Sequence, residues 1–220
     1  MLAILLLMLP CVPSAAPAGV EPEKPNRWEK AILAFEEKDR QQMPAPGQIL
    51  FVGSSTIRIW KVQECFPGLD ILNRGFGGSE YSDVARYASR IILPYRPKTI
   101  VLYGGDNDIA GGKDADQVFK DFSDLVARIR SGLPDALIIV LSLKASPARL
   151  DKYPEMQKAN TLLSGFAQKQ PHMKFVDVGS PILDSDGHTR RDLFMDDGLH
   201  LNAEGYKIWT SILKPLLAEG

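Results

Sequence analysis

Hydrophobic residues gather in short, unbroken runs along this chain, and each run ends beside a small or polar residue. The first run is Gln48–Val52, which ends at Gly53, and a later example is Thr99–Tyr103, which ends at Gly104. Such short runs, rich in Ile and Val and without alternation of polarity, are typical of strands buried on both faces of a sheet. The pattern predicts strands at residues 48–52, 70–73, 99–103, 136–141 and 174–178.

Segments with the periodicity of amphipathic helices alternate with these runs. In the first segment Trp28, Ile32 and Phe35 fall on one helical face. Asn26 and Glu29 are spaced as a capping box that would begin this helix. The periodicity predicts helices at residues 27–40, 81–92, 114–131, 153–170 and 202–217.

The alternation of strands and helices predicts an α/β fold with a parallel sheet and right-handed crossovers. Five strand–helix units are too few for an eight-stranded barrel. We therefore expect an open three-layer αβα sandwich with a five-stranded parallel sheet, formed as one domain by residues 27–220.

The N-terminal residues differ from the rest of the chain. Residues 1–9 (MLAILLLML) are apolar but too few to cross a bilayer, and Ala16-Pro17-Ala18 matches the small-x-small pattern of a signal-peptidase site. We therefore expect a cleavable signal peptide at 1–18, a linker at 19–26, and a secreted or periplasmic mature protein. Because Lys and Arg are absent from the start of the run, a buried strand or a weak membrane anchor stays open as an alternative.

The two cysteines bear on this interpretation. A lipoprotein is less favoured, because Pro10 directly before Cys11 is a poor match to the small residue of a lipobox. Two cysteines, Cys11 and Cys65, are too few for a disulfide scaffold or a cysteine-based zinc site, and cleavage after Ala18 would leave Cys65 unpaired. No later segment is long and apolar enough to span a membrane, so we expect no integral membrane span after processing.

The charge balance and the spacing of the histidines argue against nucleic acid and metal ions as binding partners. The chain has 26 Lys and Arg against 27 Asp and Glu, which provides no basic field for nucleic acid. Two of the histidines, His172 and His188, fall in polar turns and are expected to be exposed, and the three histidines lack metal-ligand spacing. Residues 106–117 begin like a calcium loop but lack its ligands at the fifth and twelfth positions. We expect no metal and no cofactor.

Residues capable of catalysis follow the predicted strands. Ser55 follows the first strand, Gly78 the second and Asn107 the third, while Asp197 precedes His200 by three residues just before the last helix. Each has an ordinary structural explanation: a helix cap, a turn glycine, an Asx-turn, and a capping Asp beside a surface His. All of them nevertheless map to the carboxyl edge of one sheet, where ligands of open α/β folds bind. There a serine, an oriented imidazole and convergent N–H donors could carry out acyl transfer.

Four sequence blocks in this order resemble the SGNH (GDSL-like) hydrolase family. They are Phe51–Thr56 (FVGSST), Asn73–Gly78 (NRGFGG), Gly105–Asn107 (GDN) and Asp197–His200 (DGLH). The resemblance implies a flavodoxin-like sandwich in which Ser55 is the nucleophile and His200 the base, oriented by Asp197. It also implies an oxyanion hole made by the N–H groups of Ser55 and Gly78 and by the side chain of Asn107.

The chain departs from the family pattern at two positions. Ser54 stands where the usual Gly-Asp-Ser has an aspartate, and Ser79 stands where many members have one. The aspartate that Ser54 replaces is not the acid of the family's triad, so the chemistry need not be lost, although the rigidity of the loop could differ.

By this resemblance the protein is expected to be a metal-independent serine esterase or acylhydrolase that cleaves a carboxylic ester of a small molecule or carbohydrate. Two alternatives remain open. One is a deacetylase or acyltransferase acting on a cell-envelope or plant-type polysaccharide ester, and the other is a non-catalytic carbohydrate-binding module. Residues that could line a substrate groove, or be structural, are Arg58, Trp60, Tyr103 and the segment 146–149.

Overall fold

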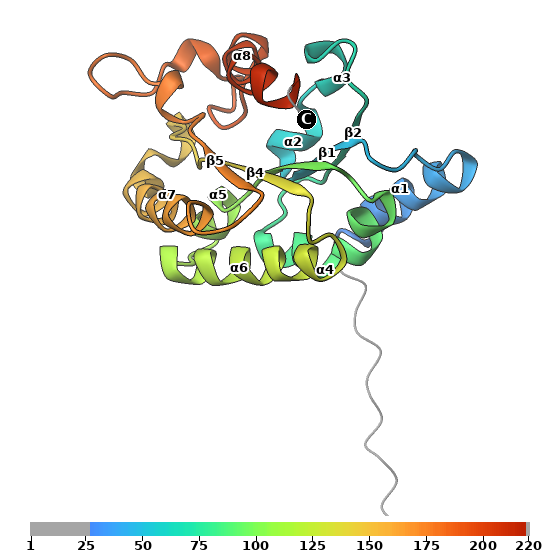
Figure 1. Ribbon diagram of the computed structural model, residues 1–220. Coiled ribbons are helices and arrows are strands. Elements are labelled where there is room, and N and C mark those ends of the chain that lie inside the picture. The colour runs from blue at the N-terminus through green and yellow to red at the C-terminus, as the bar shows by residue number, and fades with distance from the viewer. Residues whose placement is uncertain (1–26, 219–220) are drawn as a thin grey trace, which may run out of the picture.

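Five parallel strands form the middle layer of the computed structural model, which describes residues 27–218 (Figure 1). The strands are β1 (Ile49–Gly53), β2 (Ile71–Gly75), β3 (Thr99–Tyr103), β4 (Leu137–Leu141) and β5 (Met173–Val176). Their spatial order is β2-β1-β3-β4-β5. After β1 the chain first adds β2 on one side of β1 and then adds β3, β4 and β5 on its other side. The carboxyl end of β1 therefore lies at the point where the strand order reverses, which is where open α/β sheets bind ligands.

Helices connect these strands and cover both faces of the sheet. The α-helices within residues 27–218 are α1 (Glu29–Gln41), α2 (Ser55–Ile59), α3 (Val62–Cys65), α4 (Tyr81–Ile91), α5 (Asp106–Ala110), α6 (Ala115–Gly132), α7 (Tyr153–Ala167) and α8 (Ala203–Ala218). Short 3-10 helices are η1 (Leu93–Tyr95), η2 (Pro147–Lys152), η3 (Ser180–Ile182) and η4 (Arg191–Leu193). The predicted strands and longer helices are all present, and the predicted α/β fold with a five-stranded parallel sheet is confirmed.

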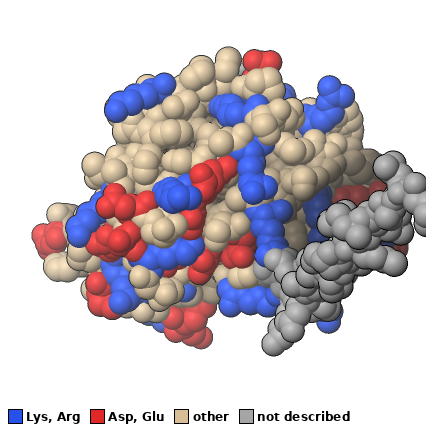
Figure 2. Space-filling model, turned by 90° about the horizontal axis from the view of Figure 1, so that it is seen from below, with Lys and Arg blue, Asp and Glu red and all other residues tan. Residues whose placement is uncertain are grey.

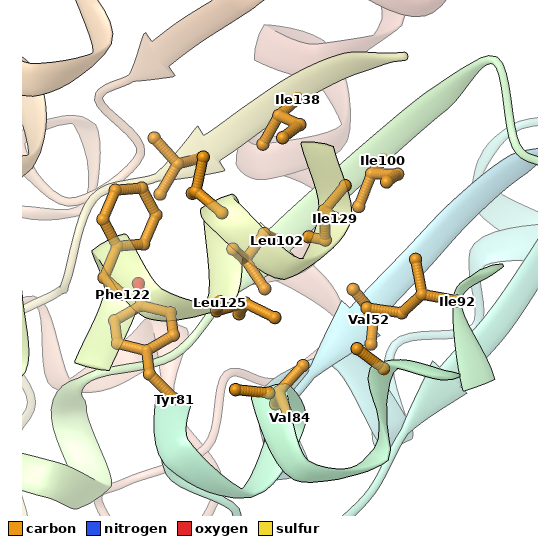
Figure 3. Close-up of a cluster of buried hydrophobic side chains, with 14 of the residues drawn as sticks. Val52, Tyr81, Val84, Ile92, Ile100, Leu102, Phe122, Leu125, Ile129 and Ile138 are labelled. Carbon is orange, nitrogen blue, oxygen red and sulfur yellow. The ribbon is translucent and has the colours of Figure 1, made fainter. Parts of the chain in front are cut away.

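Alternate residues of the strands supply two hydrophobic cores. Val52 of β1 belongs to the core beneath α1, α4, α6 and α7, whereas its neighbour Phe51 belongs to the core beneath α2, α3 and α8. Figure 3 shows part of the first core, where Val52 and Leu102 of the sheet lie with Phe122 and Leu125 of α6. Because both faces are covered, the inner strands β1, β3 and β4 are almost entirely apolar, whereas the edge strands β2 and β5 also contain Asn73, Arg74 and Lys174.

The first helix begins later than the sequence predicts. Helix α1 starts at Glu29, and Trp28 occupies the cap position without a capping side-chain hydrogen bond. The Glu29 carboxylate instead accepts hydrogen bonds from Arg90 (2.8 Å) and Tyr87 (3.2 Å) of α4. The capping box predicted for this helix is therefore wrong in the role of Glu29, whose carboxylate is used in tertiary contacts. Asn26, the predicted signal peptide 1–18 and the predicted linker 19–26 lie outside the described residues.

The face covered by α4 and α6 carries acidic and basic side chains interspersed with one another (Figure 2). A shallow depression between these helices is lined by residues of both signs, including Asp83, Arg86, Asp121 and Arg128. Within residues 27–218, no helix combines the length and the apolarity that a membrane crossing requires.

Candidate active site

Ser55 is placed at the carboxyl end of β1 by an unusually tight turn. Gly53 has φ +142°, and a Cβ at this position would lie 1.9 Å from the carbonyl oxygen of Tyr103 on β3. Only glycine therefore fits between the two strands at this point. Ser54 then caps α2, and Ser55 is the first helical residue, so its backbone N–H has no acceptor within the helix.

His200 reaches Ser55 from the loop before α8. Its Nε2 lies 2.8 Å from Ser55 Oγ, and its Nδ1 lies 2.6 Å from Asp197 Oδ2. An ionised carboxylate can only accept hydrogen bonds, so in the neutral imidazole Nδ1 carries the proton. Nε2 is then the acceptor for the Ser55 hydroxyl. The three residues are thus connected in the order that general-base activation of a serine requires.

The turn that carries this pair is held by Asp197 itself. Asp197 Oδ1 accepts hydrogen bonds from the backbone N–H groups of Leu199 (2.8 Å) and His200 (3.0 Å). Burial alone would raise the pKa of Asp197, but the hydrogen bonds from the His200 side chain and from these N–H groups lower it to about 2. The carboxylate is therefore ionised at neutral pH.

A second contact connects α8 with α2, the helix that carries the serine. The Tyr206 hydroxyl donates a 2.7 Å hydrogen bond to the backbone oxygen of Thr56, across 150 residues of sequence. Trp209 of the same helix packs edge-on against Trp60, at 5.7 Å between ring centroids. The last helix thus fixes the position of the serine turn as well as that of the histidine loop.

Gly78 lies in the loop after β2 and has φ +73°. Two carbonyl oxygens of this loop accept hydrogen bonds from residues that precede α1. Trp28 Nε1 donates to Gly77 O and Arg27 donates to Gly78 O, each at 2.9 Å. Sequence reasoning did not find these two contacts, because nothing local in residues 27–28 indicates a partner some fifty residues away.

Asn107, on α5, has an amide whose orientation is determined by its neighbours. Its Nδ2 donates to the backbone oxygen of Ser79 at 3.0 Å, and its Oδ1 accepts from Arg149 at 3.0 Å. An amide nitrogen carries two hydrogens, so the second N–H of Asn107 remains for another acceptor.

The two serines that depart from the family pattern are both buried. Ser54 and Ser79 are each 1% exposed, and among the described residues their hydroxyl oxygens have no hydrogen-bond partner. A family aspartate at either position would place a carboxylate where this chain has an uncharged hydroxyl.

The candidate groove residues have different locations. Trp60 and Tyr103 are core residues, 2% and 0% exposed, whereas Arg58 is exposed beside Gly77. Of these candidates, only Arg149 is hydrogen-bonded to a predicted site residue within residues 27–218.

A groove with a volume of about 710 Å³ lies between the α2–α3 segment and α8. Its walls include Ile59, Trp60, Met195, Leu201 and Tyr206, so its lining is mainly apolar. Leu201 follows His200 directly, which places one end of the groove wall next to the histidine in sequence.

The two remaining histidines are exposed, as predicted. His188 shares an exposed turn with Asp184 and Asp186, and one ligand atom from each lies within 4.8 Å of the others. Asp184 Oδ1 accepts the backbone N–H groups of Asp186 (3.0 Å) and His188 (2.8 Å), so this carboxylate closes the turn.

Comparison with known protein families identifies the family of this chain. The model of the GDSL-like Lipase/Acylhydrolase family matches residues 60–208. The chain belongs to this family. As a family member it is a hydrolase of the esterase and acylhydrolase type, and the resemblance seen in the four sequence blocks is confirmed. Among curated proteins, none matches the chain.

Solved structures share the fold of this GDSL-like protein at low sequence identity. One, from Streptococcus pneumonia and provisionally described as a platelet activating factor, is 22% identical with a TM-score of 0.77, covering 86% of this chain and 92% of its own. A GDSL-like lipase from Bacteroides thetaiotaomicron is 18% identical with a TM-score of 0.74, covering 86% and 97%. A carbohydrate esterase family 3 protein from Talaromyces cellulolyticus is 18% identical with a TM-score of 0.62, covering 79% and 97%. These likenesses concern the fold.

Proposed function

We propose that this GDSL-like hydrolase cleaves carboxylic esters through an acyl-enzyme on Ser55. The observation that supports the proposal best is the continuous contact from Asp197 through His200 to the Ser55 hydroxyl, at 2.6 and 2.8 Å. A serine that only capped a helix after β1 would not need an imidazole within hydrogen-bond distance of its Oγ.

In the proposed acylation step His200 Nε2 takes the hydroxyl proton while Ser55 Oγ attacks the ester carbonyl carbon. The carbonyl oxygen becomes an oxyanion, which accepts hydrogen bonds from the Ser55 N–H, the Gly78 N–H and the second N–H of Asn107. When the tetrahedral intermediate collapses, the bond to the alcohol oxygen breaks, and the proton on Nε2 passes to this leaving group. Asp197 stabilises the imidazolium throughout and keeps its own negative charge.

Deacylation repeats these steps with water as the nucleophile. His200 takes a proton from the water, hydroxide oxygen attacks the acyl carbon, and Ser55 Oγ leaves with the returned proton. The products are a carboxylic acid and a free alcohol, and no redox change occurs.

A carbohydrate ester is a second candidate substrate, in line with the alternative of a polysaccharide deacetylase. The fold shared with a carbohydrate esterase family 3 protein favours testing it. The apolar residues 1–9 and the Ala16-Pro17-Ala18 site support a secreted or periplasmic location, where such polymers occur. An uncharged ester also suits a chain of net charge −1.

The first experiment compares wild type, Ser55→Ala and Ser54→Ala, measuring turnover of p-nitrophenyl acetate and labelling by a fluorophosphonate probe. We expect wild type and Ser54→Ala to turn over the ester and to be labelled, because the Ser54 hydroxyl contacts no described base. Ser55→Ala should lose both signals. Equal rates for wild type and Ser55→Ala would exclude Ser55 as the nucleophile, and an unlabelled wild type would favour the non-catalytic binding module.

A second variant, Asn107→Ala, tests the oxyanion hole. Removing one such donor typically lowers kcat by about 10²–10³-fold. A panel of acetylated sugars and longer-chain esters then distinguishes the two substrate classes.

A further inference from the structure

The segment between β4 and α7 contacts both halves of the candidate site. The backbone N–H of Ala148 donates a 3.0 Å hydrogen bond to the carbonyl oxygen of Gly198, which lies between Asp197 and His200. The next residue, Arg149, reaches α5 with its side chain. Arg149 has φ −137° and ψ 30°, so it interrupts the 3-10 conformation of η2 at this residue.

The guanidinium of Arg149 makes two hydrogen bonds to α5. One nitrogen donates to the backbone oxygen of Asp106 at 3.0 Å, and the other donates to Asn107 Oδ1 at 3.0 Å. A guanidinium can only donate, so the oxygen of the Asn107 amide must face it. If the amide were rotated by half a turn, its NH2 would meet the guanidinium and its oxygen would meet the carbonyl oxygen of Ser79. Both contacts would be lost.

Buried charges hold the guanidinium in this position. The Arg149 side chain is 19% exposed and lies 3.6 Å from the buried carboxylate of Asp106. Lys144, 1% exposed, lies 3.8 Å from the same carboxylate oxygen. Two cations therefore surround one anion next to Asn107, and one of them, Arg149, is hydrogen-bonded to the Asn107 amide itself.

We propose that Arg149 is a positioning residue that orients the Asn107 amide and polarises it, so that its second N–H is a stronger and better-aimed donor to the oxyanion. This inference rests on the proposed function. Arg149 acts through Asn107 and does not itself touch the reacting atoms.

A double-mutant cycle between Arg149 and Asn107 tests the proposal. In the wild-type background, Arg149→Met should lower kcat by about 10–100-fold with little change in KM, because misplacing a catalytic group by about 1 Å has an effect of this size. In the Asn107→Ala background the same substitution should lower kcat by less than about 3-fold, since residues that act on one another are not additive. An equal loss in both backgrounds would overturn the proposal.

Two further variants separate positioning from loss of folding. Arg149→Lys keeps the charge but lacks the planar fork, so it should recover only part of the lost rate. Arg130→Met is the matched control, because Arg130 also donates to backbone oxygens, those of Ala136 and His172, but at the ends of β4 and β5 away from the serine. It should lower the unfolding midpoint in urea without lowering kcat. Full activity of folded Arg149→Met would overturn the proposal.

A measurement without turnover distinguishes this inference from the proposed function. In ¹⁵N–¹H NMR spectra the Asn107 side-chain amide signals, assigned by their loss in Asn107→Ala, should move towards the positions of a free amide in Arg149→Met. Unchanged signals would overturn the role of Arg149 even if Ser55 is an active nucleophile. Conversely, if no ester is cleaved and Ser55 is not labelled, the proposed function fails while the NMR result still decides whether Arg149 orients the amide.

Discussion

The two sides of helix α5 carry opposite excesses of charge. On one side the Asp106 carboxylate lies near two cations, Lys144 at 3.8 Å and Arg149 at 3.6 Å. On the other side Asp108 lies 3.0 Å from one cation, Lys113. That ammonium also contacts Glu80 at 2.8 Å and Asp121 at 2.6 Å, so three carboxylates share it.

The difference in charge between the two sides of α5 corresponds to a difference in their surroundings. The cation-rich side includes the arginine that bonds Asn107, where the proposed reaction develops a negative charge. The acid-rich side is directed into the junction of α4 and α6, where Glu80 caps α4 in a reciprocal capping box with Asp83. One short helix thus separates charges that would support catalysis from charges that join helices. Substitutions on the first side should change rate, and those on the second should change stability.

Of the substitutions that test the difference between the two sides of α5, replacement of Lys113 should have the largest effect, which is a loss of stability. Lys113→Met removes the ammonium that contacts these three carboxylates, one of them on the fully buried side chain of Asp108. Removing one partner of a buried pair typically costs 3–5 kcal/mol, and because the Lys113 side chain is 23% exposed we expect a loss of about 2–3 kcal/mol. Urea unfolding measures it. Lys120→Met, which removes an exposed pair with Asp124, is the control and should leave the free energy of unfolding nearly unchanged, because solvent screens this pair.

On the opposite side, Lys144→Met should lower the rate, which Lys113→Met should leave nearly unchanged. Burial lowers the pKa of Lys144, while attraction to Asp106 opposes this shift. At an effective dielectric constant of about 20, a charge one layer of side chains away from another interacts with it by roughly 1–2 kcal/mol. Loss of the buried charge should therefore reduce kcat by about tenfold. If Lys113→Met lowers kcat as much as Lys144→Met does, the division of roles between the two sides is wrong.

The smallest expected effect is the contribution of Asp108 to the pH dependence of the free energy of unfolding. Burial raises the pKa of Asp108 to about 6, although hydrogen bonding from Lys113 opposes the increase. The unfolded value is about 3.9, so between about pH 4 and pH 6 the folded protein binds the additional proton. The stability associated with this proton is fully present below the unfolded pKa and is lost as the pH rises through about 6.

Asp108→Asn should remove this dependence, because the amide oxygen can still accept from Lys113 and from the Tyr81 backbone N–H. The free energy of unfolding of the variant, relative to wild type, should therefore rise between pH 4 and pH 7 in urea titrations. A difference that is constant or falls over this range would show that Asp108 is not protonated preferentially in the folded state.

Much of the fold was predictable from local pattern. The run Thr99–Tyr103 was predicted as a strand with the bounds that the structure has, because a strand buried on both faces has no exposed position to interrupt its apolar residues. The boundaries of α1 were less predictable. Glu29 has the spacing of a capping residue, but a partner on another helix, Arg90, decides its contacts.

The candidate site was predictable to the extent that its residues follow strand ends. The order of the strands brings Ser55, Gly78 and Asn107 to one edge whatever the details of the loops are. The orientation of the Asn107 amide was not predictable, because it depends on Arg149, which is 42 residues away in sequence. Trp60 packs in the core and also contributes to the wall of the groove, and the sequence alone favoured neither role over the other. Its packing against Phe51, at 5.4 Å between ring centroids, depends on tertiary contacts that no single segment encodes.

The contact between Tyr206 and Thr56 has a consequence for the order in which the protein becomes competent during its synthesis. A ribosome completes the serine turn long before it adds His200 and the tyrosine that holds the turn. Domains generally fold as units during synthesis, and here one core lacks its covering helix until residues 203–218 have emerged. A growing chain therefore lacks the contact between Ser55 and His200 through most of its synthesis, and the proposed hydrolysis can begin only after α8 has been added.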